Sequence, residues 1–189
     1  TFIAMIILVL AWSMSEISRE LHTVDFLIAS LGETIPASVL PAAIFVLAAF
    51  TAFSTGSSWG AMGILLPLVL PLCWAIMTSQ GLSSGGDYAI LYASVSGVLA
   101  GAVWGDHCSP ISDTTVMSSL SAGCDHIEHV RTQLPYAVLA GAAALLFGTI
   151  PTSLGLPWWV GMLLAATVTA LGLRLLGQPV EDYRPAGDA

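Results

Sequence analysis

Apolar residues dominate the chain in runs that suit helices in a lipid bilayer. The runs cover residues 1–12, 35–53, 59–77, 88–104, 134–150 and 156–176. A bilayer-spanning helix needs roughly 20 apolar residues, and several of these runs reach or approach that length. Residues 34–86 contain no charged side chain and no histidine. The pattern therefore predicts an all-α integral membrane protein.

Two polar breaks interrupt this pattern. The first break is residues 54–58, which read Ser-Thr-Gly-Ser-Ser. The second break is a longer polar stretch that follows Trp104 and Gly105 and contains Pro110. Glycine loosens a helix, and proline removes a backbone donor and clashes with the preceding turn. Backbone groups freed at membrane depth must find partners or line a cavity. The breaks predict discontinuous or re-entrant helices that meet at a midplane site. The region 35–77 fits two crossings, a re-entrant hairpin, or one crossing with a half-helix.

Polar segments suggest how the chain is divided. Residues 1–176 are interpreted as one transmembrane domain and residues 177–189 as a polar tail. The segments 13–25 and 122–133 are predicted loops, and each contains one of the four arginines. Short loops bearing arginine tend to be cytoplasmic, which predicts a cytoplasmic C-terminus. The first run lacks a basic leader, so we expect the chain to be the C-terminal part of a longer transporter.

Composition narrows the choice of partners. Hydrophobic residues make up 56% of the chain and charged residues 8%, with a mean hydropathy of +0.87, whereas a soluble domain carries about 25% charged residues. The net charge is −8 and lysine is absent, which argues against nucleic acid and anionic lipids as partners. Three cysteines without paired spacing argue against a disulfide framework.

The stretch 104–119, WGDHCSPISDTTVMSS, offers the ligands that a hard cation prefers. Carboxylates at membrane depth are costly and mark ion or proton pathways by default. Alkali cations exchange their water shell for carboxylate, carbonyl and hydroxyl oxygens, and a carboxylate in a low-dielectric cavity can also hold a proton. Cation and proton then compete for one anionic site. The predicted cation- and proton-binding residues are Asp106, Ser109, Ser112, Asp113, Thr114 and Thr115.

Plainer interpretations stay open beside this one. The segment 112–115 suits the N-terminus of a helix that starts near residue 113, so at least one of its side chains is expected to cap that helix. Asp106 could lie in an aqueous loop. The weaker candidates for lining the substrate path are Thr55, Ser57 and Ser58, because small residues in membrane helices also serve close packing.

The histidines and cysteines around the second break do not favour a zinc site. His107, Cys108, Cys124, His126 and His129 lack the paired spacing of zinc ligands. The last two histidines lie in the predicted loop 122–133, where a solvated role is favoured over pH sensing. No metal other than a transported ion is expected.

The residues at both breaks resemble a known family. The stretch 104–119, the following AGCDHIEHVRTQLPYA at 122–137 and FSTGSSWGAMGILLPL at 53–68 are similar in identity and order to the C-terminal half of the NhaC-type sodium/proton antiporters. The resemblance implies one half of an inverted-repeat transporter, in the plasma membrane, that exchanges Na⁺ or Li⁺ for H⁺ without a cofactor. It also implies that an N-terminal half, or a second copy of the chain, completes the site.

Other functions remain as alternatives. Relatives of this family exchange organic acids such as malate for lactate. No arginine or lysine lies between residues 20 and 130 to hold an anion, which favours the inorganic cation, but half-helix N-termini could bind an anion without arginine. Two membrane aspartates could also serve an intramembrane aspartyl protease, although its Gly-x-Gly-Asp pattern is absent. A purely structural subunit leaves the polar stretch 104–119 unexplained. The sequence therefore favours a transporter over an enzyme.

Overall fold

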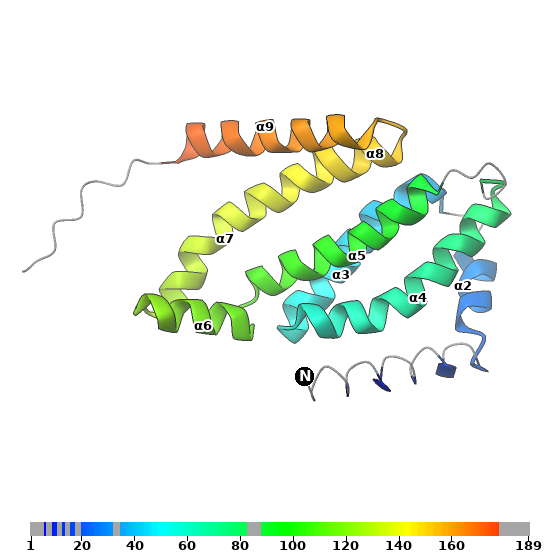
Figure 1. Cartoon of the computed structure of the whole chain (residues 1–189), viewed down its shortest axis with the longest axis horizontal. Coiled ribbons are helices and arrows are strands. Elements are labelled where there is room, and N and C mark those ends of the chain that lie inside the picture. The colour runs from blue at the N-terminus through cyan, green and yellow to red at the C-terminus, as the bar shows by residue number, and fades with distance from the viewer. Residues whose placement is uncertain are drawn as a thin grey trace, which may run out of the picture.

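The protein is described by a computed structural model, which covers residues 20–31, 35–82 and 88–177 and isolated positions before residue 20. Every regular element within these residues is a helix (Figure 1). The predicted tail after residue 177 and most of the first apolar run lie outside the described residues. The elements are α2 (Thr23–Leu31), η1 (Ala37–Val39), α3 (Leu40–Thr55), α4 (Ser58–Ser79), α5 (Ala89–Cys108), α6 (Asp113–Ala122), α7 (His126–Ala143), η2 (Ala144–Thr149), α8 (Ile150–Ser153) and α9 (Trp158–Leu176).

Five helical segments are long and apolar enough to cross a membrane. They are Ala37–Thr55, Ser58–Ser79, Ala89–Cys108, His126–Ser153 and Trp158–Leu175. The fourth segment joins α7, a π-helical stretch (η2) and α8 without interruption. The prediction of an all-α, multi-pass membrane protein is confirmed.

The first polar break separates two helices. α3 is followed by Gly56, which has a left-handed backbone with φ of 65° and donates its backbone N–H to the carbonyl oxygen of Ala52. Ser57 is extended and caps α4, because its hydroxyl oxygen accepts a hydrogen bond from the backbone N–H of Gly60 at 3.2 Å. Of the three interpretations of residues 35–77, the structure has two helices that are each long enough to cross.

α3 and α5 lie side by side and run in the same direction (Figure 1). The facing pairs are Pro41 with Gly97, Phe45 with Gly101, and Ala49 with Gly105. A Cβ atom at Gly105 would overlap the carbonyl oxygen of Ala49, so only glycine allows this approach. Small residues every fourth position are the usual means of close packing between membrane helices. Because the pair is parallel, the C-terminal ends of both helices reach the same level.

α4 packs against both members of this pair and encloses the main apolar core. The buried core residues are Ala37, Leu40, Ile44, Ala48, Leu65, Val69, Cys73, Ile76, Met77 and Val98. α7 contacts α5 from another side and runs antiparallel to it, and α9 packs against α7 and η2. A second, smaller cluster of Ala52, Ala61 and Ala102 lies nearer in sequence to the two polar breaks.

The predicted loop 122–133 is wrong, because α7 already begins at His126. The carboxylate of Asp125 caps this helix and accepts hydrogen bonds from the backbone N–H groups of Ile127 and Glu128, each at 3.0 Å. An aspartate at the N-cap with a glutamate three residues later is typical of a helix start. The polar composition of residues 122–133 favoured a loop and outweighed this helix-start pattern. The first two turns of α7 carry polar side chains toward the second break.

Candidate cation site at two adjoining helix breaks

The second break lies between α5 and α6. α5 ends at Cys108, and α6 starts at Asp113, as the sequence predicts. Ser112 occupies the N-cap position with an extended backbone, but its hydroxyl makes no capping hydrogen bond. That hydroxyl instead donates to the Oδ1 atom of Asp106 at 2.8 Å. One of the residues that suited a helix cap in the sequence therefore bonds a carboxylate instead.

A small cluster of oxygen ligands surrounds Asp106. The Thr114 hydroxyl lies 3.3 Å from the Oδ2 atom of Asp106 and 2.8 Å from the Ser112 hydroxyl. Asp106 is 6% exposed and Ser112 is fully buried, whereas Thr114 is exposed. The three side chains lie within hydrogen-bond distance of one another, and the two hydroxyl hydrogens can fill two of the three contacts while the carboxylate is ionised. Thr114 is the member open to the outside. We name Asp106, Ser112 and Thr114 the Asp106 cluster.

The surroundings of Asp106 favour a positive ligand. Within the described part of the chain, no basic side chain forms an ion pair with Asp106. Asp106 also sits in the last turn of α5, where the unpaired carbonyl groups of a helix carry partial negative charge. A buried carboxylate needs a compensating charge or a proton. The Asp106 cluster can hold either one.

The two breaks adjoin each other. The Ser109 hydroxyl, which is fully buried, donates to the carbonyl oxygen of Phe53 in the last turn of α3, at 2.7 Å. A Cβ atom at Gly56 would lie 2.9 Å from the carbonyl oxygen of Ile111, so the main chains of the two breaks are in contact. This contact agrees with the expectation that two interrupted helices come together. Both helices end here with their carbonyl groups, the polarity that suits a cation.

The remaining predicted site residues have other positions. Thr115 is buried and its hydroxyl lies 3.5 Å from the carbonyl oxygen of His107. Asp113 is exposed and makes no hydrogen bond to the Asp106 cluster. The Thr55 hydroxyl donates to the carbonyl oxygen of Thr51 in its own helix. Ser57 caps α4, and Ser58 is half-buried at its start.

Two α7 side chains that the sequence analysis did not select reach the second break. The amide nitrogen of Gln133 donates to the carbonyl oxygen of His107, and the Nε2 atom of His126 lies 2.7 Å from the carbonyl oxygen of Pro110. α7 therefore supplies partners to the carbonyl groups of His107 and Pro110 at the second break. The N-cap pattern at Asp125 was the only signal for this arrangement, since it places both side chains on a helix.

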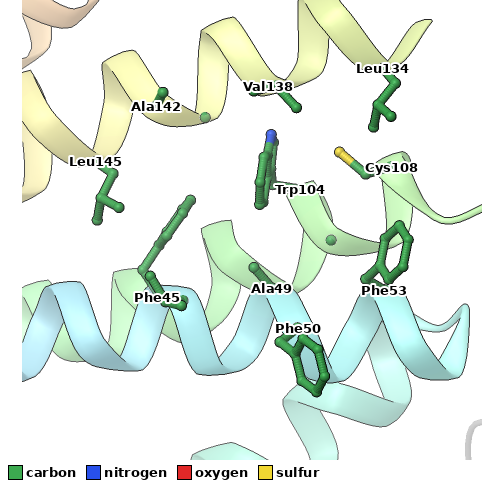
Figure 2. A pocket seen from close by; sticks show the side chains of 13 residues that line it. Phe45, Ala49, Phe50, Phe53, Trp104, Cys108, Leu134, Val138, Ala142 and Leu145 are labelled. Atoms are coloured by element: carbon green, nitrogen blue, oxygen red, sulfur yellow. The ribbon is translucent and has the colours of Figure 1, made fainter. Parts of the chain in front are cut away.

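A cavity of about 420 Å³ lies between α3, α5 and α7, but it is not the polar site. Figure 2 shows Trp104 in its centre, with aromatic and aliphatic side chains around it. Trp104 fixes α7 by donating from Nε1 to the carbonyl oxygen of Ala137 at 2.7 Å. Asp106 is not among the lining residues. The apolar lining cannot supply ligands to an ion.

The alternatives based on metal or protease chemistry gain no support from the geometry. Among the described residues, no group of three or more His, Cys, Asp or Glu side chains is arranged to hold a metal ion. Asp106 is buried and Asp113 is exposed, and the two carboxylates share no hydrogen bond. A protease dyad requires two carboxylates that share a proton.

Comparison with known proteins finds sequence similarity to antiporters. A sequence profile described as the Na⁺/H⁺ antiporter family matches residues 1–150. An uncharacterized protein of Haemophilus influenzae is 43% identical over 140 residues, covering 74% of this chain and 25% of the relative. An uncharacterized Na⁺/H⁺ antiporter of the same organism is 35% identical over 106 residues, covering 54% of the chain and 20% of the relative.

A third relative has a more specific description. The malate-2H⁺/Na⁺-lactate antiporter of Bacillus subtilis is 28% identical over 119 residues, covering 62% of the chain and 23% of the relative. The chain thus matches about a quarter or less of the length of these relatives. No solved structure matches the chain.

Proposed function

Because the chain belongs to the Na⁺/H⁺ antiporter family, we propose that it carries the ion site of a secondary antiporter that exchanges Na⁺ or Li⁺ for H⁺. The observation that supports this most strongly is the Asp106 carboxylate, which is buried at a helix C-terminus without a basic partner among the described residues. Its contacts are hydroxyl groups, whose oxygen atoms are ligands for hard cations.

The exchange would follow from a change in what Asp106 holds. When the carboxylate is ionised and empty, the hydroxyls of Ser112 and Thr114 donate to it. When Na⁺ binds, both hydroxyls must turn their hydrogens away so that their oxygen lone pairs face the ion. The 2.8 Å contact between the two hydroxyls gives one of these hydrogens an acceptor. A proton on Asp106 would leave no anionic ligand for the ion, so each cargo excludes the other.

The other predicted site residues have supporting roles in this proposal. Ser109 joins the second break to the end of α3, and Thr115 satisfies a carbonyl group next to the site. Asp113 adds negative charge at the exposed edge, which would attract cations. Thr55, Ser57 and Ser58 form the adjoining break and would line the path of the ion.

The finer assignments go beyond the family match and are proposals. We propose the NhaC-type subgroup, a location in the plasma membrane and a cytoplasmic C-terminus. The matched regions make up 25% and 20% of two relatives, and we propose that further membrane segments or a second copy of the chain enclose the open side of Thr114.

An exchanger of organic acids is the second candidate, because one relative is described as a malate and lactate antiporter. An organic anion needs a cationic or N–H-rich partner. No basic side chain among the described residues pairs with the Asp106 cluster. The backbone N–H groups at the start of α6 are the donors that remain there, and the carboxylates of Asp106 and Asp113 beside them oppose an anion. The two candidates separate in inverted membrane vesicles that contain the full-length protein. Proton flux driven by Na⁺ or Li⁺ alone would support the cation antiporter. Flux that requires malate or lactate, with none from Na⁺ alone, would reject it.

Replacing Ser112 with alanine is expected to raise the Na⁺ concentration for half-maximal exchange by about fivefold, because one hydroxyl ligand of ordinary strength is lost. The measurement is the dependence of proton flux on Na⁺ in vesicles. The control is Ser118→Ala, which removes an exposed hydroxyl from the same helix. Equal Na⁺ dependence in both variants would remove Ser112 from the site.

A further inference from the structure

The only two arginines between residues 20 and 177 lie on neighbouring helices, and this interval contains no lysine. Arg131 is in the second turn of α7, and Arg174 is in the last turn of α9. α9 packs against α7, and a Cβ atom at Gly172 would lie 2.9 Å from the side chain of Leu139. Because a short turn joins α8 to α9, the start of α7 and the end of α9 lie on the same side of this helix pair (Figure 1).

A cavity of about 320 Å³ opens between the two helices at this end. We name it the α7–α9 wedge, and its lining residues are Thr132, Pro135, Tyr136, Leu139, Gly172, Leu173 and Gly177. Arg131 directly precedes Thr132 on one wall, and Arg174 directly follows Leu173 on the other. Both arginine side chains are exposed, that of Arg131 to 78%. A long, positively charged side chain therefore adjoins each wall of the wedge.

The lining of the wedge restricts the kind of molecule that fits it. Its walls combine aliphatic side chains and glycine with the hydroxyl-bearing side chains of Thr132 and Tyr136. A helix about 10 Å across would fill this volume in less than one turn, so the wedge is too small for a further membrane helix. A free phosphate ion would gain nothing from the aliphatic side chains. An acyl chain suits them, and tyrosine is typical of the level at which lipid headgroups lie.

The positive charge beside the wedge favours an anionic headgroup. Arginine binds phosphate oxygens through two parallel hydrogen bonds, and basic residues near a membrane surface attract anionic lipids. Glu128 lies 3.6 Å from Arg131, but both side chains are exposed, and an exposed ion pair contributes little. The Arg131 guanidinium therefore stays available. The net charge of −8 does not oppose this local attraction, because charges more than about 10 Å away are largely screened at about 0.1 M salt.

We propose that the α7–α9 wedge binds one phospholipid with an anionic headgroup. Part of an acyl chain lies along the aliphatic side chains of the wedge, and Arg131 and Arg174 bind the phosphate from its two sides. The site is separate from the Asp106 cluster, and its existence does not depend on the proposed function. The antiporter profile matches residues 1–150, so the α9 wall of the wedge lies outside the family match.

The variants that test the proposal are Arg131→Gln and Arg174→Gln, which keep a long polar side chain without its positive charge. The affinity of the purified full-length protein for phosphatidylglycerol is measured by native mass spectrometry in a non-ionic detergent. Each variant should bind this lipid about fivefold more weakly than wild type, the change that one basic residue makes at a membrane surface. The control, Arg184→Gln, changes an arginine beyond the described residues and should bind like wild type. Unchanged affinity in both wedge variants, or an equal loss in Arg184→Gln, overturns the proposal.

A second measurement needs only the wild-type protein. We expect phosphatidylglycerol to bind at least about tenfold more tightly than phosphatidylcholine, because two arginines adjoin a headgroup whose negative charge is not balanced within the lipid. The difference should shrink as the salt concentration rises. Inorganic phosphate at the same concentration as the lipid should not displace it, because the ion makes no use of the aliphatic wall. Equal affinity for the two lipids, or displacement by inorganic phosphate, overturns the proposal whether or not the variants fold.

Discussion

Replacing Asp106 with asparagine is expected to abolish Na⁺-driven proton exchange and to leave the protein folded in the membrane. The amide keeps the shape of the side chain and can still bond Ser112, but it cannot carry the negative charge or the proton. Removing one charged partner from a buried pair costs roughly 3–5 kcal/mol, so we expect exchange to fall by at least about a hundredfold. The measurement is proton flux in inverted vesicles with matched protein content.

Variants of two other carboxylates, Glu128 and Asp113, serve as comparisons for Asp106→Asn. Glu128→Gln neutralises an exposed side chain whose only ion pair within the described residues is with Arg131, and it should exchange like wild type. Asp113→Asn neutralises an exposed carboxylate at the edge of the site, and it should lower exchange less than Asp106→Asn does. If Asp113→Asn abolishes exchange while Asp106→Asn retains it, the ion-binding carboxylate is Asp113.

Replacing Gly105 with alanine is expected to destabilise the protein and to inactivate it. The added methyl group would overlap the carbonyl oxygen and Cα of Ala49, and main-chain atoms cannot turn aside as a side chain can. Overpacking of this kind costs about 1–3 kcal/mol. α3 and α5 would separate, which would also shift Asp106 relative to the adjoining break. The measurements are the thermal unfolding midpoint in detergent and proton flux in vesicles.

The matched control for Gly105→Ala lies in the outer helices. At Gly148 the nearest atom to an added Cβ would be the Cβ of Ala165 at 3.8 Å, an ordinary contact. Gly148→Ala should therefore keep the wild-type midpoint or raise it, because alanine favours a helix over glycine. If Gly105→Ala unfolds at the same temperature as Gly148→Ala, the close approach of α3 and α5 is not needed for stability.

Structural features that depend only on residues near one another in the sequence could be predicted. The apolar runs gave the spanning helices, since length and hydropathy suffice for that inference. Glycine and proline marked both breaks, and the start of α6 at Asp113 followed from the residues around it. The three residues of the Asp106 cluster were among the predicted site residues because carboxylates and hydroxyls are rare at membrane depth.

Features that depend on packing could not be predicted in the same way. The parallel pairing of α3 and α5 depends on glycines facing main-chain atoms of a helix distant in sequence, such as Gly105 and Ala49. Ser112 suited a helix cap, and only the folded chain shows that the nearby carboxylate of Asp106 takes its hydroxyl instead. The roles of His126 and Gln133 depend on α7 passing beside the second break, which no local pattern indicates.

The central claim is that one carboxylate, that of Asp106, binds Na⁺ and H⁺ in turn. Proton release on addition of Na⁺ to the purified full-length protein in weakly buffered detergent tests this most directly. The account predicts that wild type releases protons and that Asp106→Asn releases none, while Glu128→Gln behaves as wild type. Undiminished proton release from folded Asp106→Asn protein would contradict the account.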